Sequence, residues 1–99
     1  EKPREITPQL IIEVVAEHYN ISVDQMISKN RSASIVRPRQ IAMFLCRQMV
    51  DTPLEAIGIL LGGRDHSTIV HGTKKIGSEY EENPSFRQEI DSIKKKTSL

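Results

Sequence analysis

The stretch DTPLEAIGILLGGRDHSTIVHGTKKI, residues 51–76, carries the signals for two helices joined by a short turn. In its first half, Thr52 is the expected N-cap, Pro53 takes the first helical position and Glu55 completes a capping box. The glycine pair at 62–63 then ends this helix, because glycine readily adopts the left-handed conformation found just past a helix C-terminus. The pattern predicts a helix, a glycine turn and a second helix.

The second helix of this stretch is predicted to have an apolar back and a polar front. Asp65 is its expected N-cap, and the helix is expected to run from His66 to about Glu82. At about 100° per residue, one stripe should face the core: Ile69, Val70, Thr73, Ile76, Gly77 and Tyr80. The opposite arc carries hydroxyl, imidazole and amine groups: Ser67, Thr68, His71, Lys74, Lys75 and Ser78.

The rest of the chain also shows helical patterns, and no segment has the alternation that is typical of strands. Four more helices are expected: Pro8–Tyr19 behind a Thr7 cap, a short one after a Ser22–Gln25 capping box, Pro38 to about Val50, and Ser85–Lys96. The polar stretch SKNRSAS, residues 28–34, is expected to be a loop. Six helices without a sheet predict an all-α domain that contains a helix-turn-helix.

The composition limits the class of protein. A chain of 99 residues with 4% aromatic residues has room for one domain with a modest aliphatic core. Its single cysteine excludes an intrachain disulfide and suits a cytoplasmic protein, and no apolar run approaches the ~20 residues of a membrane span. The net charge of +1 hides a basic region, because residues 29–75 hold eight basic and three acidic residues. Such a region is typical of a polyanion-binding protein, although a solvated charged face would look the same.

Three catalytic or ligand-binding interpretations of residues 61–75 fit poorly. A phosphate-binding P-loop needs a Lys-Ser/Thr pair after its last glycine and a strand before the loop, and neither is present. Zinc needs about four ligands, whereas His66 and His71 diverge around a helix and leave only Cys46 and His18. A Ser67–His71 pair lacks an orienting acid and an oxyanion hole. We therefore expect no metal and no catalytic residue in this chain.

The helix-turn-helix interpretation suits the residue types on the polar front. In this motif the N-terminal residues of the second helix reach base edges in the major groove. Asp65 can accept a hydrogen bond from cytosine, while the hydroxyls and imidazoles of the front can donate or accept. Arg64, Lys74 and Lys75 would supply charge for phosphates. The pattern alone leaves both a DNA-binding role and a purely structural helix pair open.

One group of motifs narrows the choice. The segment GGRDHSTIVHGTKKI at residues 62–76, with RPRQIAMFL at 37–45 and SKNRSAS at 28–34 upstream, closely resembles the C-terminal domain of the bacterial replication initiator family DnaA. The resemblance covers essentially the whole chain and implies a Trp-repressor-like helical fold. It also implies that residues 1–6 are a linker from an upstream ATPase domain and that residues 7–99 are the origin-binding domain. ATP or ADP would then bind upstream, and no cofactor would bind in this chain.

The resemblance implies a function and a set of contact residues. The family's domain binds double-stranded DNA at nine-base-pair origin boxes of the TTATCCACA type, in a cytoplasmic, nucleoid-associated protein that also contacts other initiator protomers and protein regulators. Residues in the base-reading positions are Asp65, His66, Ser67, Thr68 and His71 in the major groove and Arg31 in the minor groove. Residues expected at the phosphate backbone are Arg39, Gln40, Arg47, Leu54, Arg64 and Lys74.

Three positions depart from the family's pattern. Gly72 and Gly77 lie within the second helix of the motif, and each costs up to ~1 kcal/mol relative to alanine. Family members often have alanine at the first of these two positions. Ala33 replaces a residue that is sometimes basic, so Arg31 would be the only arginine of this loop in the minor groove.

Overall fold

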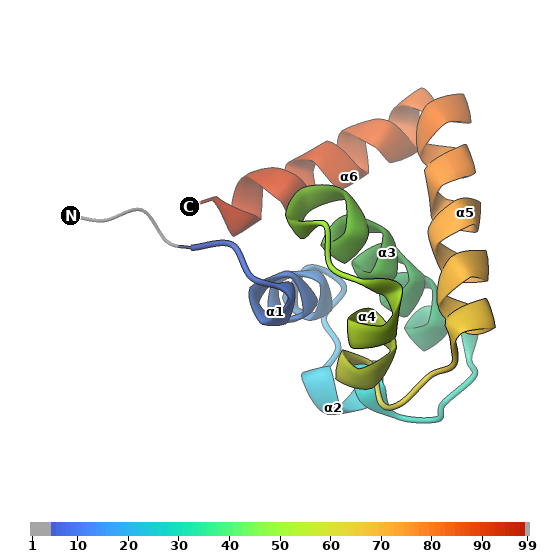
Figure 1. The fold of residues 1–99 in the computed structure, drawn as a ribbon. Helices are drawn as coiled ribbons and strands as arrows, with labels where there is room; N and C mark the ends of the chain where they lie inside the picture. Colours follow the sequence, from blue (N-terminus) through green and yellow to red (C-terminus); the bar gives the residue numbers. More distant parts are fainter. Residues whose placement is uncertain (1–4, 99) are drawn as a thin grey trace.

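Six α-helices and no strand form residues 5–98, the part of the chain that the computed structural model describes (Figure 1). The helices are α1 (Pro8–His18), α2 (Val23–Ile27), α3 (Ala33–Val50), α4 (Leu54–Leu60), α5 (His66–Glu82) and α6 (Pro84–Thr97). The predicted all-α class and the number of helices are confirmed. Residues 1–4, most of the expected linker at 1–6, lie outside the described residues, as does Leu99. None of the described helices is long and apolar enough to cross a membrane.

The long helix α3 lies at the centre and packs against α1, α2, α4 and α5, while α6 packs against α1 and α5 (Figure 1). The core between the helices is aliphatic, as predicted, and its fully buried side chains come from every helix, among them Ile11, Met26, Ile41, Ile57, Ile76 and Ile90. Each such side chain contributes about 1.5–3 kcal/mol of transfer free energy. This packing sets the angle at which α5 stands against α3, with one face of α5 left in solvent.

Side-chain caps begin four of the helices, and three of these caps, Thr7, Ser22 and Asp65, are the predicted ones. The Thr7 hydroxyl accepts from the Leu10 amide at 3.1 Å, and the Asp65 carboxylate accepts from the Thr68 amide at 2.9 Å. The Ser22–Gln25 capping box is complete, with bonds of 3.0 and 2.9 Å. Asn83 ends α5 and caps α6, where its side chain accepts from the Phe86 amide at 3.1 Å.

Helix α3 begins at Ala33, so the prediction of a loop through residue 34 and a helix starting at Pro38 is wrong. Pro38 lies inside the helix and cannot donate to the carbonyl four residues before it, which is that of Ser34. Ser34 is exposed in the first turn, where water can satisfy its carbonyl. Ile35 is 3% exposed, and its burial holds this first turn on the core despite the proline.

Helix α4 begins without the cap that its sequence predicts. Pro53 is the N-cap and its side chain cannot accept a hydrogen bond from the first turn, so the predicted Thr52–Glu55 capping box is wrong. Thr52 is 6% exposed, and its hydroxyl points into the protein without a partner. Asp51 ends α3 in the left-handed region at φ 48°, and this reversal turns Thr52 inward rather than toward the start of α4.

Candidate nucleic-acid interface

The turn between α4 and α5 is closed by backbone hydrogen bonds and by glycines that nothing larger can replace. The Gly58 carbonyl accepts from the amides of Gly63 and Arg64 at 2.9 and 3.0 Å. A Cβ at Gly58 would lie 2.3 Å from the Arg64 carbonyl oxygen, and one at Gly62 would lie 2.2 Å from the Ile27 carbonyl oxygen. The turn glycines at 62 and 63 have φ of +90° and +81°, as predicted. Gly58 was missed, although a glycine inside a seven-residue helix was a visible signal of close approach.

Helix α5 has the two faces that its sequence predicts. Ile69, Gly72 and Ile76 are buried against α3 and α4, and the rest of the predicted stripe is half-buried. The polar front is exposed, and we call this surface the α5 front: His66, Ser67, Thr68, His71, Lys74, Lys75 and Ser78. Figure 1 shows α5 at the edge of the molecule, with its N-terminal end next to the α4 turn and the loop that precedes α3. The α5 front is therefore accessible to a large partner.

Asp65 joins the α5 front to the helix that carries it. One carboxylate oxygen accepts the Thr68 amide, and hydrogen bonding from Thr68 holds the pKa of Asp65 below its usual value. The carboxyl group is exposed. Asp65 therefore caps the helix as an ionised group and remains within reach of a partner.

Arg31 lies on an exposed but internally bonded loop between α2 and α3. The Asn30 side chain accepts from both the amide and the hydroxyl of Ser32 at 2.8 Å. The loop and the start of α5 enclose a hollow of about 380 Å³, lined by Lys29, Arg31, Val36, Arg39, Arg64 and Thr68 with the turn glycines. The structure thus brings Arg31 together with the N-terminal end of the α5 front around a strongly basic hollow.

Arg39, which was expected at the phosphate backbone and therefore on the surface, is a buried residue. It is 4% exposed, and its guanidinium donates to the carbonyls of Met26 at 2.7 Å, Ser28 at 3.0 Å and Asn30 at 3.1 Å. Burial lowers the pKa of Arg39, and the nearby positive charge of Arg64 lowers it further. Because α3 starts at Ala33, Arg39 lies one helical turn after buried Ile35 and on the same face. The predicted helix started at Pro38 and left Ile35 outside it, so this relation was not recognised.

Arg64 is half-buried, and its guanidinium also bonds to backbone carbonyls, those of Leu61 and Ser28. Burial lowers the pKa of Arg64 as well. Its side chain therefore lies across the turn and does not extend into solvent as a free phosphate ligand would. Arg39 and Arg64 share the Ser28 carbonyl as an acceptor.

The other residues expected at phosphates lie along the flank of α5. Gln40 is half-buried beside Gly72, where a Cβ on the glycine would lie 3.2 Å from the Gln40 Cγ. Arg47 is exposed and contacts Asp51 at 3.3 Å and the Thr52 carbonyl at 3.2 Å. Leu54 is half-buried at the start of α4, and Lys74 lines a shallow groove between α3 and α5 with Phe44 and Gln48.

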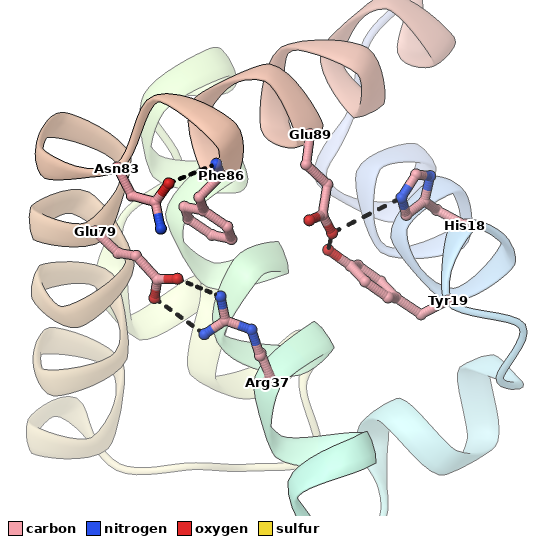
Figure 2. A network of polar contacts seen from close by, with 7 residues as sticks. All are labelled: His18, Tyr19, Arg37, Glu79, Asn83, Phe86 and Glu89. Carbon is pink, nitrogen blue, oxygen red and sulfur yellow. Dashed lines mark hydrogen bonds and ion pairs between the residues drawn. The ribbon is translucent and has the colours of Figure 1, made fainter.

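Sequence reasoning also missed a polar network behind α5 (Figure 2). Arg37 of α3 donates to both carboxylate oxygens of Glu79 on α5, with one bond of 3.0 Å, and its guanidinium stacks 4.8 Å from the centre of the Phe86 ring. In the same view, Tyr19 of α1 donates to Glu89 of α6. Burial, followed by the carboxylate of Glu89, raises the pKa of Tyr19. The network ties α1, α3, α5 and α6 together.

Within the described chain, three cations of the interface, Arg31, Lys74 and Lys75, lack the ion pairs that the cations behind α5 form. Among residues 5–98, no ion pair joins Arg31, Lys74 or Lys75 to a carboxylate. Within the same residues, no three His, Cys, Asp or Glu side chains come together as a metal site. The interface therefore presents hydrogen-bonding groups and positive charge.

Comparisons with known proteins point to one family. Residues 8–76 match the family model described as bacterial dnaA protein helix-turn-helix. The chain is 45% identical over 96 residues to the chromosomal replication initiator protein DnaA of Lachnoclostridium phytofermentans (97% of this chain, 21% of the relative). It is 44% identical over 95 residues to that of Treponema pallidum (96% of this chain, 20% of the relative). The chain thus spans about a fifth of the length of these curated relatives.

Two solved structures share the fold. A crystal structure of a DNA replication initiation factor superposes with a TM-score of 0.81 at 27% identity, over 91% of this chain and 27% of that one. The structure of AMPPCP-bound DnaA from Aquifex aeolicus superposes with a TM-score of 0.74 at 26% identity, over 91% of this chain and 26% of that one. The arrangement of the six helices is therefore one that relatives share.

Proposed function

This chain belongs to the family of bacterial DnaA helix-turn-helix domains, and we propose that it binds double-stranded DNA with sequence specificity. The observation that carries the proposal is the α5 front, which is exposed and basic, forms no ion pair within residues 5–98 and directly follows a closed glycine turn. An α-helix fits the major groove, and the N-terminal residues of a recognition helix meet the base edges there.

We assign base contacts to the first two turns of α5. His66, Ser67, Thr68 and His71 are exposed on one arc and can donate or accept hydrogen bonds. Asp65 can accept from a cytosine amino group with the carboxylate that also caps α5. A side chain that is fixed by its own helix cap loses little freedom when it meets a base.

We assign Arg31 to the adjacent minor groove, where a narrow A·T-rich groove concentrates negative potential. Lys74, Arg47, Gln40 and the start of α4 at Leu54 then flank α5 near the phosphate backbones. Arg39 and Arg64 are no longer in this contact set, because their guanidinium groups are bonded to backbone carbonyls inside the fold.

The proposed target is the nine-base-pair origin box of the TTATCCACA type that the family resemblance implies. In the longer protein, this domain would place an ATP-dependent initiator, with its other protomers and its regulators, on the replication origin in the bacterial cytoplasm. The family resemblance places the nucleotide in an upstream domain, and the AMPPCP-bound relative is about four times as long as the part that this chain matches. The domain itself would contribute binding and no catalysis.

Fluorescence anisotropy with a TTATCCACA duplex and a scrambled duplex, measured across a salt series, tests the proposal. We expect the box to bind at least about tenfold more tightly than the scrambled duplex at every salt concentration, because base contacts add to the salt-dependent phosphate term. Equal binding to both duplexes would show that the basic face attracts DNA without reading this box. Absence of binding to either duplex would instead favour a helical domain that binds other proteins.

A further inference from the structure

We propose that Arg39 and Arg64 are positioning residues that fix the Arg31 loop against the start of α5, and so set the spacing between the minor-groove and major-groove contacts. The inference rests on the proposed function, and it assigns these two arginines a role that replaces phosphate contact. Its basis is the set of backbone carbonyls that the two side chains bind, including the Ser28 carbonyl, which accepts from both.

Arg39 holds the loop from inside the protein. Its Nε donates to the Met26 carbonyl, and its Nη2 donates to the carbonyls of Ser28 and Asn30, which lie on either side of Lys29. Hydrogen bonds from a guanidinium are charge-assisted, and its planar fork fixes direction as well as distance. At 4% exposure, the side chain cannot extend toward a phosphate without breaking these bonds.

Arg64 ties the same loop to the α4–α5 turn. Its guanidinium donates to the Ser28 carbonyl and to the Leu61 carbonyl, and Arg64 directly precedes Asp65, the cap of α5. A second close contact runs parallel to this one, because Gly62 approaches the Ile27 carbonyl so closely that no Cβ fits between them. Two contacts therefore join the end of α2 to the start of α5: the hydrogen bond from Arg64 to the Ser28 carbonyl, and the close packing of Gly62 on the Ile27 carbonyl.

The consequence concerns Arg31, which directly follows Asn30. The Asn30 carbonyl is held by Arg39, and the Asn30 side chain holds Ser32, so the backbone on both sides of Arg31 is fixed while its side chain is exposed. Successive base pairs are about 3.4 Å apart, so a shift of the loop by that distance moves the Arg31 contact by one base pair. Arg39 and Arg64 thus set which base pairs Arg31 meets when α5 is in the major groove.

A double-mutant cycle on the box duplex separates positioning from phosphate contact. Arg39→Lys keeps the charge but cannot bridge the three carbonyls. We expect Arg31→Ala and Arg39→Lys each to weaken box binding about tenfold, and the double variant to be within about twofold of either single variant. Arg87→Lys on α6 is the matched control, because the Arg87 guanidinium also donates to backbone carbonyls, those of Tyr80 and Glu81, away from the α5 front, and it should lose less than about threefold. Losses that multiply in the double variant, or an Arg39→Lys variant that binds like the wild type, would overturn the proposal.

Limited trypsin digestion without DNA tests the same restraint, because trypsin cuts after Lys29 and Arg31. We expect Arg39→Lys to raise the cleavage rate at these two bonds at least about tenfold and to leave cleavage after Lys74 unchanged. If circular dichroism shows that Arg39→Lys is unfolded, Arg64→Lys takes its place in both measurements. Unchanged cleavage in the folded variant would overturn the positioning role, whereas wild-type chain without box preference would overturn only the proposed function.

Discussion

The α5 front and the junction behind it, where α3, α5 and α6 meet, use basic residues in opposite ways. At the junction, Arg37 binds both oxygens of Glu79, and Lys94 lies 3.8 Å from Asp91. On the α5 front, Lys74 and Lys75 form no ion pair within residues 5–98, although the positive charge of Lys75 contributes to the lowered pKa of Glu79. One side of the helix has its charges neutralised inside the fold, and the other side keeps them for a partner.

The difference shows that the groups which surround an arginine decide whether its charge is available to a partner. Arg31 is exposed, Arg37 is paired with a carboxylate, and Arg39 is bonded to backbone carbonyls, although the three lie within nine residues of one another. Only Arg31 can contribute its full charge to the field that attracts a polyanion. A count of basic residues in this region therefore overstates the DNA-facing charge.

The largest effect that would sharpen this comparison is expected on the α5 front. His71→Ala or Thr68→Ala should weaken binding to the box by about 1–3 kcal/mol and binding to random DNA very little, because each would remove one of the proposed base contacts. Both residues are exposed, so the melting temperature should stay within about 2 °C of the wild type. Ser78→Ala, two turns further along the same face, is the matched control and should keep full affinity. Equal loss on both duplexes would assign His71 and Thr68 to the backbone.

A smaller effect is expected at the junction, and it should appear in stability rather than in DNA binding. Arg37→Met should lower the free energy of unfolding by about 1–2 kcal/mol, because it removes a bidentate pair and leaves Glu79 without its donor. Chemical denaturation measures this loss, and the ratio of box to scrambled affinity should not change. A changed ratio would show that the junction transmits its packing to the α5 front.

The pH dependence of the same pair gives an independent check. Hydrogen bonding from Arg37 holds the pKa of Glu79 below its ordinary value of 4.5. A lowered folded-state pKa stabilises the protein above the ordinary value, and this contribution is lost as the pH falls through the lowered one. The stability difference between wild type and Glu79→Gln should therefore be constant at neutral pH and shrink below about pH 4.5. A difference that persists at low pH would mean that packing, and not the ion pair, accounts for the loss.

The parts of the fold that depend on neighbouring residues could be predicted from the sequence. Caps at Thr7, Ser22 and Asp65, the turn glycines and the two faces of α5 follow from spacings of two to four residues. The polar α5 front was found for the same reason, since one helical period places its members together. Family resemblance added the DNA target and the individual contact roles, which spacing alone left open.

The parts that depend on distant contacts could not be predicted. Arg37 and Glu79 are 42 residues apart, and nothing local marks them as partners. Arg39 looked like a surface arginine because a proline before it suggested a helix start, whereas burial of Ile35 extends α3 past that proline. Thr52 looked like a cap because its position in the sequence suits one, but the left-handed Asp51 turns it inward. For the start of α3 and for Thr52, the conformation of the folded chain outweighed a local preference of about 1 kcal/mol.

The smallest expected effect concerns the two glycines inside α5, Gly72 and Gly77, which pack against α3 at different distances. A Cβ at Gly77 would lie 3.5 Å from the Phe44 ring, an ordinary contact, so Gly77→Ala should raise the free energy of unfolding by about 0.5–1 kcal/mol through helix propensity. A Cβ at Gly72 would lie 2.6 Å from the sulfur of Met43, which is 1% exposed and has little room to move.

Gly72→Ala should therefore gain no stability, because the overlap with Met43 offsets the propensity term. Urea denaturation of the two variants, run side by side, compares them directly, and the double variant Gly72→Ala with Met43→Leu tests whether the sulfur is the obstacle. Equal stabilisation by both alanines would show that Met43 yields easily and that α5 can approach α3 less closely without cost. The spacing between α5 and α3 would then be adjustable.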